Sequence, residues 1–246
     1  MHKAMKAIVQ SCDRYHTMTE HMLVKYEQLW PSNPFTFRIP WNKKKPQNIR
    51  DKFKTKIDLI HTDIKFKETF NSLTQDLDDN EWVYWCIDDK YPIKLDEEKG
   101  NQVLNFVESI NDPKIINVCF HFVRGIENSA NCIQREGSGM EVRFEGLRFI
   151  EHKSFVNNWL HQFFRVKALR EFWGHINEPS LYKALAMDND VQPLNGISLT
   201  LDHNICVYGE STFKGFVTQN CKTSCEKFNI EVPDYFVGEK LRRIII

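Results

Sequence analysis

The segment EWVYWCIDDKYP, residues 81–92, is an apolar and aromatic run that ends abruptly in two adjacent aspartates. A short continuous apolar run bounded by polar residues is typical of a strand that is buried on both faces of a sheet. Asp88 and Asp89 then lie where the strand ends. Acidic residues and proline are ordinary ways to leave a sheet, but the carboxyl ends of strands in open α/β sheets are also where ligands bind.

The chain before residue 81 alternates between strand and helix patterns. Strands are predicted at 6–13, 35–41 and 57–63, and helices at 17–30, at 46–57 with Ile49, Phe53 and Ile57 on one stripe, and at 64–77. Such alternation indicates βαβ units and a largely parallel sheet. Because the crossovers are right-handed, the loops that follow Asp13, Asp63 and Asp88 should lie on one rim.

The second half of the chain changes character. A helix at 95–112 and a strand at 114–123 are followed by short strands mixed with irregular pieces. We find no internal repeat or Pro/Gly-rich linker, so we expect one domain, residues 1–246. Neither a G-x-G-x-x-G pattern nor a G-K-[ST] loop follows the first strand, so neither a dinucleotide fold nor a P-loop is indicated.

The charge of the chain is balanced overall but unevenly distributed. Thirty-three basic and 33 acidic side chains give a formal net charge of zero, which argues against a dedicated nucleic-acid-binding protein. Residues 43–56 hold six lysines and one arginine against Asp51, and residues 76–98 hold nine acids against two lysines. A basic patch beside an acidic edge suits a phosphorylated ligand with a metal, although solvated faces have the same composition.

The seven cysteines do not form the pattern of a disulfide framework. Cys221 and Cys225 have helical spacing, but no His or Cys pair lies near them in the sequence to complete a zinc site. We expect reduced thiols in a soluble cytoplasmic protein, since no signal peptide or membrane span is evident. The end of the chain, EKLRRIII (239–246), leaves three interpretations: an interface or contact with the inner face of the membrane, a closing strand, or the truncated end of a longer protein.

Five segments, taken in order, resemble the small bacterial and viral GT-A-type glycosyltransferases of surface-polysaccharide synthesis. These are AIVQSCDRY, IDLIHTD, EWVYWCIDDKYP, WLHQFFRVKALREFW and ICVYGESTFKG. The resemblance spans about residues 5–230, and its weight lies in the order of the segments. It implies a GT-A (Rossmann-like) fold with a mixed, mostly parallel sheet flanked by helices. A donor-binding part would cover about residues 1–125 and an acceptor-binding part about 126–246.

The resemblance also implies a nucleotide-diphosphate sugar as donor and a saccharide or lipid-linked acceptor. Asp88 and Asp89 match the acids that hold Mn²⁺ or Mg²⁺ against the diphosphate in the family. The family spacing is Asp-any-Asp, whereas Lys90 follows the pair here, so metal dependence is in question and Lys90 would itself contact phosphate. Ser11, Cys12, Asp13 and Arg14 match the loop that contacts the nucleotide, and Asp63 matches a position that contacts base or ribose. For Ser11, Asp13 and Asp63, a turn or helix-capping role is the alternative.

The acceptor half supplies the remaining candidates. Gln162 and Arg165, in the strand QFFR, match a family motif. Glu178 follows the Trp-bearing helix as the candidate general base, with Glu171 as the second choice; either is equally typical of a surface acid. We expect His121, His152, His161 and His175 to be ordinary core or surface histidines, because none has a metal-binding spacing.

Two other functions remain open. One is a non-catalytic binding protein that keeps a transferase-like fold, which the altered acidic motif favours. The other is a nucleotidyltransferase, although QSCDRYHT (10–17) lacks the Gly-rich basic loop that such enzymes carry after the first strand.

Overall fold

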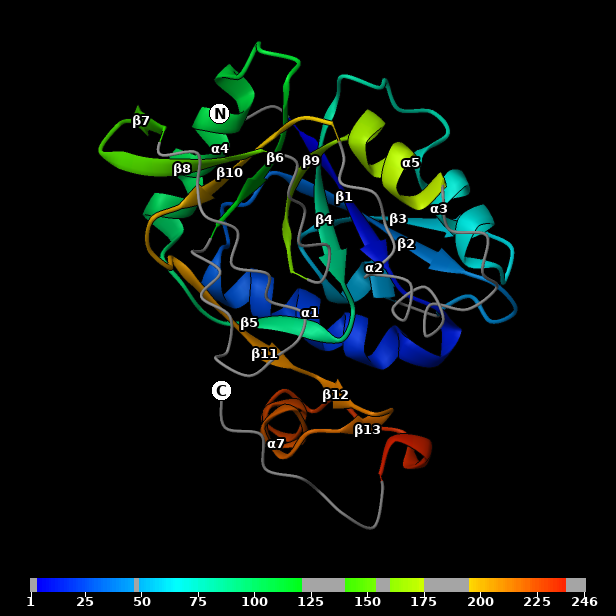
Figure 1. Ribbon diagram of the computed structural model, residues 1–246. Coiled ribbons are helices and arrows are strands. Elements are labelled where there is room, and N and C mark those ends of the chain that lie inside the picture. Colours follow the sequence, from blue (N-terminus) through cyan, green and yellow to red (C-terminus); the bar gives the residue numbers. More distant parts are fainter. Residues whose placement is uncertain (1–3, 47–48, 121–139, 154–159, 175–194, 238–246) are drawn as a thin grey trace.

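The computed structural model describes residues 4–46, 49–120, 140–153, 160–174 and 195–237 (Figure 1). Its main sheet is built from β1 (Met5–Gln10), β2 (Phe35–Trp41), β3 (Lys56–His61), β4 (Trp82–Ile87), β6 (Ile115–Cys119), β7 (Glu141–Phe144), β8 (Leu147–Lys153), β9 (Gln162–Arg165) and β10 (Ile197–Leu201). The strand order is β3-β2-β1-β4-β9-β6-β10-β8-β7.

The sheet is mixed and mostly parallel. β1 pairs in parallel with β2 and β4, β2 with β3, and β10 with β6. β9 is antiparallel to both of its neighbours, β4 and β6, and β8 is antiparallel to β10 and β7. In the described part of the main sheet, only β8 and β9 therefore run antiparallel to the other strands. The predicted fold class, a mostly parallel α/β sheet flanked by helices, is confirmed.

Helices cover both faces of the sheet, which explains the continuous apolar run of β4. The helices α1 (His16–Leu29) and α4 (Glu97–Ser109) pack on one face, and α3 (Phe66–Thr74) and α5 (Val166–Gly174) pack on the other (Figure 1). Side chains alternate between faces along a strand. Tyr84 and Cys86 accordingly join the first core, while Val83, Trp85 and Ile87 join the second.

A C-terminal segment, residues 206–237, lies against α1 and the end of the sheet (Figure 1). It contains β11 (Cys206–Glu210), β12 (Thr212–Phe213), β13 (Phe216–Val217), α7 (Gln219–Lys227) and the short 3₁₀ helix η3 (Asp234–Phe236). β11 pairs antiparallel with β5 (Lys90–Leu95), outside the main sheet. Thr218 caps α7 by accepting a hydrogen bond from the amide of Cys221.

One prediction about local structure is wrong. The helix predicted at 46–57 shrinks to α2 (Ile49–Lys52), and Ile57 belongs to β3 instead. After Asp89 the chain leaves the main sheet and forms β5, which contains Pro92. Proline is tolerated there because β5 pairs with β11 alone and need not use every amide.

No helix in the described part of the chain has the length and apolar character needed to cross a membrane. The tail 239–246 lies outside the described residues, as do His121 and His175. The division of the chain into a donor-binding and an acceptor-binding part stays a prediction.

Candidate active site at the carboxyl edge of the sheet

The adjacent acids at the end of β4 lie in a poorly hydrated environment. Asp88 is only 7% exposed. Its pKa is raised well above the ordinary value, first because the carboxyl group is removed from water and then because Asp89 lies beside it. The pKa of Asp89 is raised too, because desolvation and the nearby Glu210 carboxylate outweigh the effect of Lys90. Two neighbouring carboxyl groups are thus held where negative charge is disfavoured.

The loop after β1 adjoins this pair, as the right-handed crossovers predict. The Ser11 hydroxyl bonds the Asp88 carboxyl group and lies 2.9 Å from Thr19 Oγ1 of α1. The backbone amide of Asp88 donates to the Gln10 carbonyl, 3.2 Å away. Cys12 is exposed, and Asp88 raises the pKa of its thiol, after a larger contribution from desolvation of the sulfur. Ser11 and Cys12 therefore lie beside Asp88, and their contact with a nucleotide stays a prediction.

Asp13 organises the rim by binding main-chain amides. The short 3₁₀ helix η1 (Asp13–Tyr15) begins at this residue, and its carboxylate accepts hydrogen bonds from the amides of Asn42, Lys43 and Lys44 at 2.7–2.8 Å. Desolvation opposes ionisation, but these three amides outweigh it and lower the pKa of Asp13. Both carboxylate oxygens are thus engaged within the protein.

The ends of β2 and β3 are joined in the same way. The side-chain amide of Asn42 donates to the carbonyls of Thr62 and Asp63 and to the Thr62 hydroxyl, at 2.7–3.2 Å. Asp63 is exposed, and its carboxylate accepts from the amide of Ile64 at 2.5 Å. The N-cap of α3 is Lys65, so Asp63 does not cap that helix. The acids predicted to share one rim do so, linked through hydrogen bonds between their loops.

The basic segment begins on this rim. Lys43, Lys44 and Lys45 are exposed at the end of β2, in the loop that Asp13 holds. Lys45 Nζ lies 6.0 Å from the centre of the Trp41 ring. Further along, Lys52 pairs with Glu20 of α1 at 2.7 Å. The first part of the basic segment therefore lies on the same rim as Asp13.

The C-terminal segment closes the other side of the acid pair. Lys90 forms an ion pair with Glu210 of β11, and the amide of Ser211 donates to the Asp89 carbonyl at 2.6 Å. Because Glu210 occupies its ammonium group, Lys90 is not free to act as the predicted phosphate ligand without breaking this pair. Glu210 was not singled out from the sequence, because it lies 120 residues from its partner.

Arg14 and Tyr15 are also held by the C-terminal segment. The guanidinium of Arg14 lies 5.2 Å and 5.6 Å from the ring centres of Tyr235 and Phe236. The Tyr235 hydroxyl donates to the Arg14 carbonyl at 2.9 Å. Tyr15 packs against Phe236, and Asp88 and Asp89 both help to raise its pKa, after the main effect of desolvation. Arg14 is nevertheless exposed at the site. Tyr15, which was not predicted, lies close enough to the acid pair to be an additional site residue.

A chain of buried hydrogen bonds supports the end of β4 from beneath. His161 Nε2 donates to the carbonyl of Ile87 at 2.9 Å, which leaves Nδ1 of the neutral ring to accept from the Tyr26 hydroxyl at 2.6 Å. Tyr26 then accepts from the Tyr84 hydroxyl at 2.8 Å, and Tyr208 lies 3.2 Å from Tyr84. His161 is a core histidine, as expected, and it anchors the residue that precedes Asp88.

The predicted acceptor residues are not brought together. Gln162 is fully buried beside the end of β4; its Oε1 accepts from Asn117 at 3.0 Å. Arg165 pairs with Trp82 at the start of β4, about 20 Å from Asp88 at 3.3 Å per residue. There it bonds the carbonyls of Asn80 and Ile110.

The positions of the two candidate general bases, Glu171 and Glu178, do not test their predicted role. Glu171 is exposed on α5, where it lies 3.8 Å from Lys167. Glu178 lies outside the described residues. His152 bonds the Thr200 hydroxyl at 2.8 Å, in agreement with an ordinary structural role.

Two buried amides near the acid pair retain an unused atom. Gln10 ends β1 and is 6% exposed, and its Oε1 has no hydrogen-bond partner among the described residues. Gln162 Nε2 is likewise unpartnered within the described ranges. Since most buried polar atoms in proteins are bonded, one unused acceptor and one unused donor near this edge indicate a place where a polar group can bind.

Comparison with known proteins gives a limited result. No family model matches the sequence. No curated protein matches it significantly either. Solved structures that are similar in fold include the galactosyltransferase LgtC, with a TM-score of 0.39 and 11% identity over 78% of this chain and 67% of LgtC.

Two further similar structures have a TM-score of 0.46. One is 4-diphosphocytidyl-2C-methyl-D-erythritol synthase from Anaerococcus prevotii, 12% identical over 92% of this chain and 98% of that protein. The other is S. aureus TarS 1–349, 13% identical over 84% of this chain and 60% of TarS. LgtC and TarS are GT-A glycosyltransferases. At these scores the similarity does not bear on the activity of this chain.

Proposed function

We propose that this protein is a glycosyltransferase that moves a sugar from a nucleotide-diphosphate donor to a saccharide or lipid-linked acceptor. The observation that carries the proposal is the desolvated pair Asp88–Asp89 at the carboxyl end of β4, next to the loop after β1. In an open α/β sheet this edge is the expected ligand site. Because the surroundings disfavour the charge of both carboxyl groups in the free protein, a ligand that brings a cation would stabilise their charged forms.

The side chains present fit a divalent cation. Asp88 and Asp89 supply hard oxygen donors, which Mg²⁺ and Mn²⁺ prefer, and both carboxyl groups are under-hydrated, so a cation would relieve their unfavourable charge. When bound, the ion supplies positive charge that stabilises a departing diphosphate. Asp88 and Asp89 would hold it, with Ser11 orienting the Asp88 carboxyl group through its hydrogen bond.

Other residues of the rim would bind the rest of the donor. Lys43–Lys45 offer exposed ammonium groups for phosphate, and Arg14 offers a guanidinium already oriented by Tyr235 and Phe236. The unused amide atoms of Gln10 and Gln162 suit a sugar hydroxyl or a base edge. Deprotonation of the acceptor hydroxyl would fall to Glu178, or to Glu171 after release from Lys167.

Binding of nucleotides is the direct test. A ligand present at about 100 times its dissociation constant adds about 2.7 kcal/mol to stability. For a domain of this size that corresponds to a rise in melting temperature of roughly 5–10 °C. We expect such a rise with UDP or GDP, or with the matching nucleotide sugar, and a larger one with Mn²⁺. No shift with any nucleotide or nucleotide sugar, with or without the metal, would contradict the proposal.

Matched variants locate the binding. Asp89→Asn should abolish both the Mn²⁺-dependent part of the shift and hydrolysis of the donor sugar. The control is Asp58→Asn, which removes a carboxylate on β3 whose partner is Lys6, 3.2 Å away. This control should retain the full response. Equal responses from the two variants would place the nucleotide elsewhere.

The alternative is a binding protein without transferase activity. The ion pair between Lys90 and Glu210 and the engagement of Asp13 by three amides favour it, because both withdraw charged groups from a ligand. It predicts a nucleotide-induced thermal shift with no transfer or hydrolysis of any donor. Donor hydrolysis that Asp89→Asn abolishes would exclude it.

A further inference from the structure

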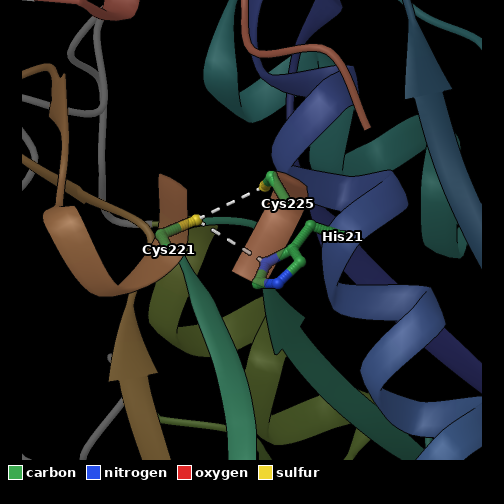
Figure 2. A group of neighbouring side chains, drawn as sticks. All are labelled: His21, Cys221 and Cys225. Atoms are coloured by element: carbon green, nitrogen blue, oxygen red, sulfur yellow. Dashed lines mark hydrogen bonds between the residues drawn. The ribbon is translucent and has the colours of Figure 1, made fainter. Parts of the chain in front are cut away.

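Three metal-binding side chains meet in the core between α1 and α7. His21 lies on α1, and Cys221 and Cys225 lie one turn apart on α7; all three are fully buried. Figure 2 shows the Cys221 sulfur joined both to the Cys225 sulfur and to the imidazole of His21. From the sequence, Cys221 and Cys225 lacked a partner for a zinc site, and the fold supplies it from a helix 200 residues earlier.

The spacing of the donor atoms fits a tetrahedral metal ion. Cys221 Sγ lies 3.9 Å from Cys225 Sγ and 3.6 Å from His21 Nδ1. Zn–S bonds of about 2.3 Å and Zn–N bonds of 2.0–2.1 Å in a tetrahedron place two sulfurs about 3.8 Å apart, and a sulfur and a nitrogen about 3.5 Å apart. These two separations agree with the tetrahedral values to about 0.1 Å, and the third, between Cys225 Sγ and the His21 nitrogen, is within 4.8 Å.

The imidazole is already oriented for coordination through Nδ1. His21 Nε2 lies 2.8 Å from the hydroxyl of Ser224, which is also on α7. If Nδ1 coordinates, Nε2 carries the proton and donates it to Ser224 Oγ. Metal-binding histidines are characteristically held by such a hydrogen bond from their second ring nitrogen.

A fourth donor is available on the same side of the cluster. Met18 lies one turn before His21 on α1, and its thioether sulfur is 3.9 Å from Cys221 Sγ. Ser211 is fully buried, and its hydroxyl has no hydrogen-bond partner among the described residues. The sulfur donors are soft ligands, which select zinc or cuprous copper over magnesium, calcium and manganese.

We propose that His21, Cys221 and Cys225 form a structural Zn²⁺ site that fastens α7 to α1, with Met18 as the fourth ligand. On binding, the two thiols ionise and release their protons, and the sulfur lone pairs and the Nδ1 lone pair are donated to the metal. A disulfide is not the alternative. Residues four apart on a helix have Cβ atoms about 5–6 Å apart, whereas a disulfide needs about 3.5–4.5 Å.

The zinc site would stabilise the proposed active site through the C-terminal segment. α7 belongs to the same C-terminal segment as Glu210, Tyr235 and Phe236, which contact Lys90, Arg14 and Tyr15. Fastening α7 would therefore hold these contacts in place. The inference is independent of the transferase proposal, because it concerns only the core between α1 and α7.

Metal analysis of the protein tests the inference. A tag-free protein, purified without chelator, should contain close to one zinc per chain by elemental analysis. Exchange of the zinc for Co²⁺ should give a thiolate-to-cobalt charge-transfer band and the visible bands of tetrahedral cobalt. A chelator should lower the melting temperature, and added Zn²⁺ should restore it. Protein that contains no zinc and does not acquire Zn²⁺ or Co²⁺ would overturn the proposal.

Three variants separate coordination from packing. Cys225→Ala should lose the zinc, whereas Cys86→Ala, which removes an equally buried thiol from β4, should keep it. Ser224→Ala is the gentler probe, because Ala is favourable in a helix and Ser224 is only partly buried. It should fold normally and bind Zn²⁺ about ten- to a hundredfold more weakly. Unchanged zinc affinity in Ser224→Ala together with full zinc content in Cys225→Ala would assign any bound zinc to another place.

Discussion

Replacement of Tyr26 by phenylalanine probes the hydrogen-bond chain beneath the acid pair. The Tyr26 hydroxyl donates to His161 Nδ1 at 2.6 Å and accepts from Tyr84 at 2.8 Å. All three side chains are fully buried. Tyr26→Phe removes one oxygen and leaves the rings in place, so the change affects hydrogen bonding with little change in packing.

The expected loss of stability follows from the two groups left without Tyr26. A buried polar group that loses its partner costs about 1–3 kcal/mol. His161 Nδ1 loses the hydroxyl that satisfies it, while the Tyr84 hydroxyl can turn toward Tyr208, 3.2 Å away, and loses less. We therefore expect a total of about 2–4 kcal/mol. For a domain of this size the melting temperature should fall by roughly 4–16 °C.

Urea unfolding is the assay, and Tyr208→Phe is the matched control. In this series of hydrogen bonds, Tyr208 contacts Tyr84 and the thiol of Cys206, which is a weak hydrogen-bonding group. Its removal leaves Tyr84 bonded to Tyr26, so the cost should be about 1 kcal/mol. Both variants should keep the wild-type dependence on urea. If Tyr26→Phe destabilises the protein no more than Tyr208→Phe does, the inferred direction of the chain is refuted.

Three further changes test the rim and its surroundings. Asp13 has a folded-state pKa below its unfolded value, so its contribution to stability is present above about pH 4 and is lost as the pH falls through the folded pKa. Asp13→Asn should lower the free energy of unfolding by about 1–2 kcal/mol at pH 7. In pH-dependent urea unfolding, the variant should also lose less stability than the wild type below pH 4. Lys90→Met leaves Glu210 partly buried without its partner and should cost about 1–3 kcal/mol, and adding Glu210→Gln should recover part of this loss in a double-mutant cycle. Gly209→Ala places a Cβ atom 2.7 Å from the Tyr91 ring, so overpacking should cost about 1–3 kcal/mol, and an unchanged unfolding midpoint would disprove the close contact.

The sequence was sufficient for the features that depend on local pattern. The apolar run of residues 82–87 predicted a doubly covered strand, and β4 is fully buried. The acid-terminated strands predicted a shared rim, because parallel strands with right-handed crossovers must end on the same edge. Hydrogen bonds between the loops at Asp13, Asn42 and Asp63 link three of these ends.

What the sequence could not provide are contacts between distant residues. Periodicity compares residues a few positions apart, whereas His21 and Ser224 are 203 positions apart. The pair Cys221 and Cys225 was visible as a spacing, whereas His21 was not singled out within the helix predicted at 17–30.

The contact between Arg14 and Tyr235 spans 221 residues, nearly the whole chain. During translation at about 5–20 residues per second, roughly 10–45 s pass between synthesis of these two residues. The loop after β1 therefore emerges early from the ribosome but lacks the contacts of Tyr235 and Phe236 until the final stretch of chain is synthesised. Nascent chains that stop before residue 206 should therefore leave uncovered the part of α1 that faces α7, around Met18 and His21.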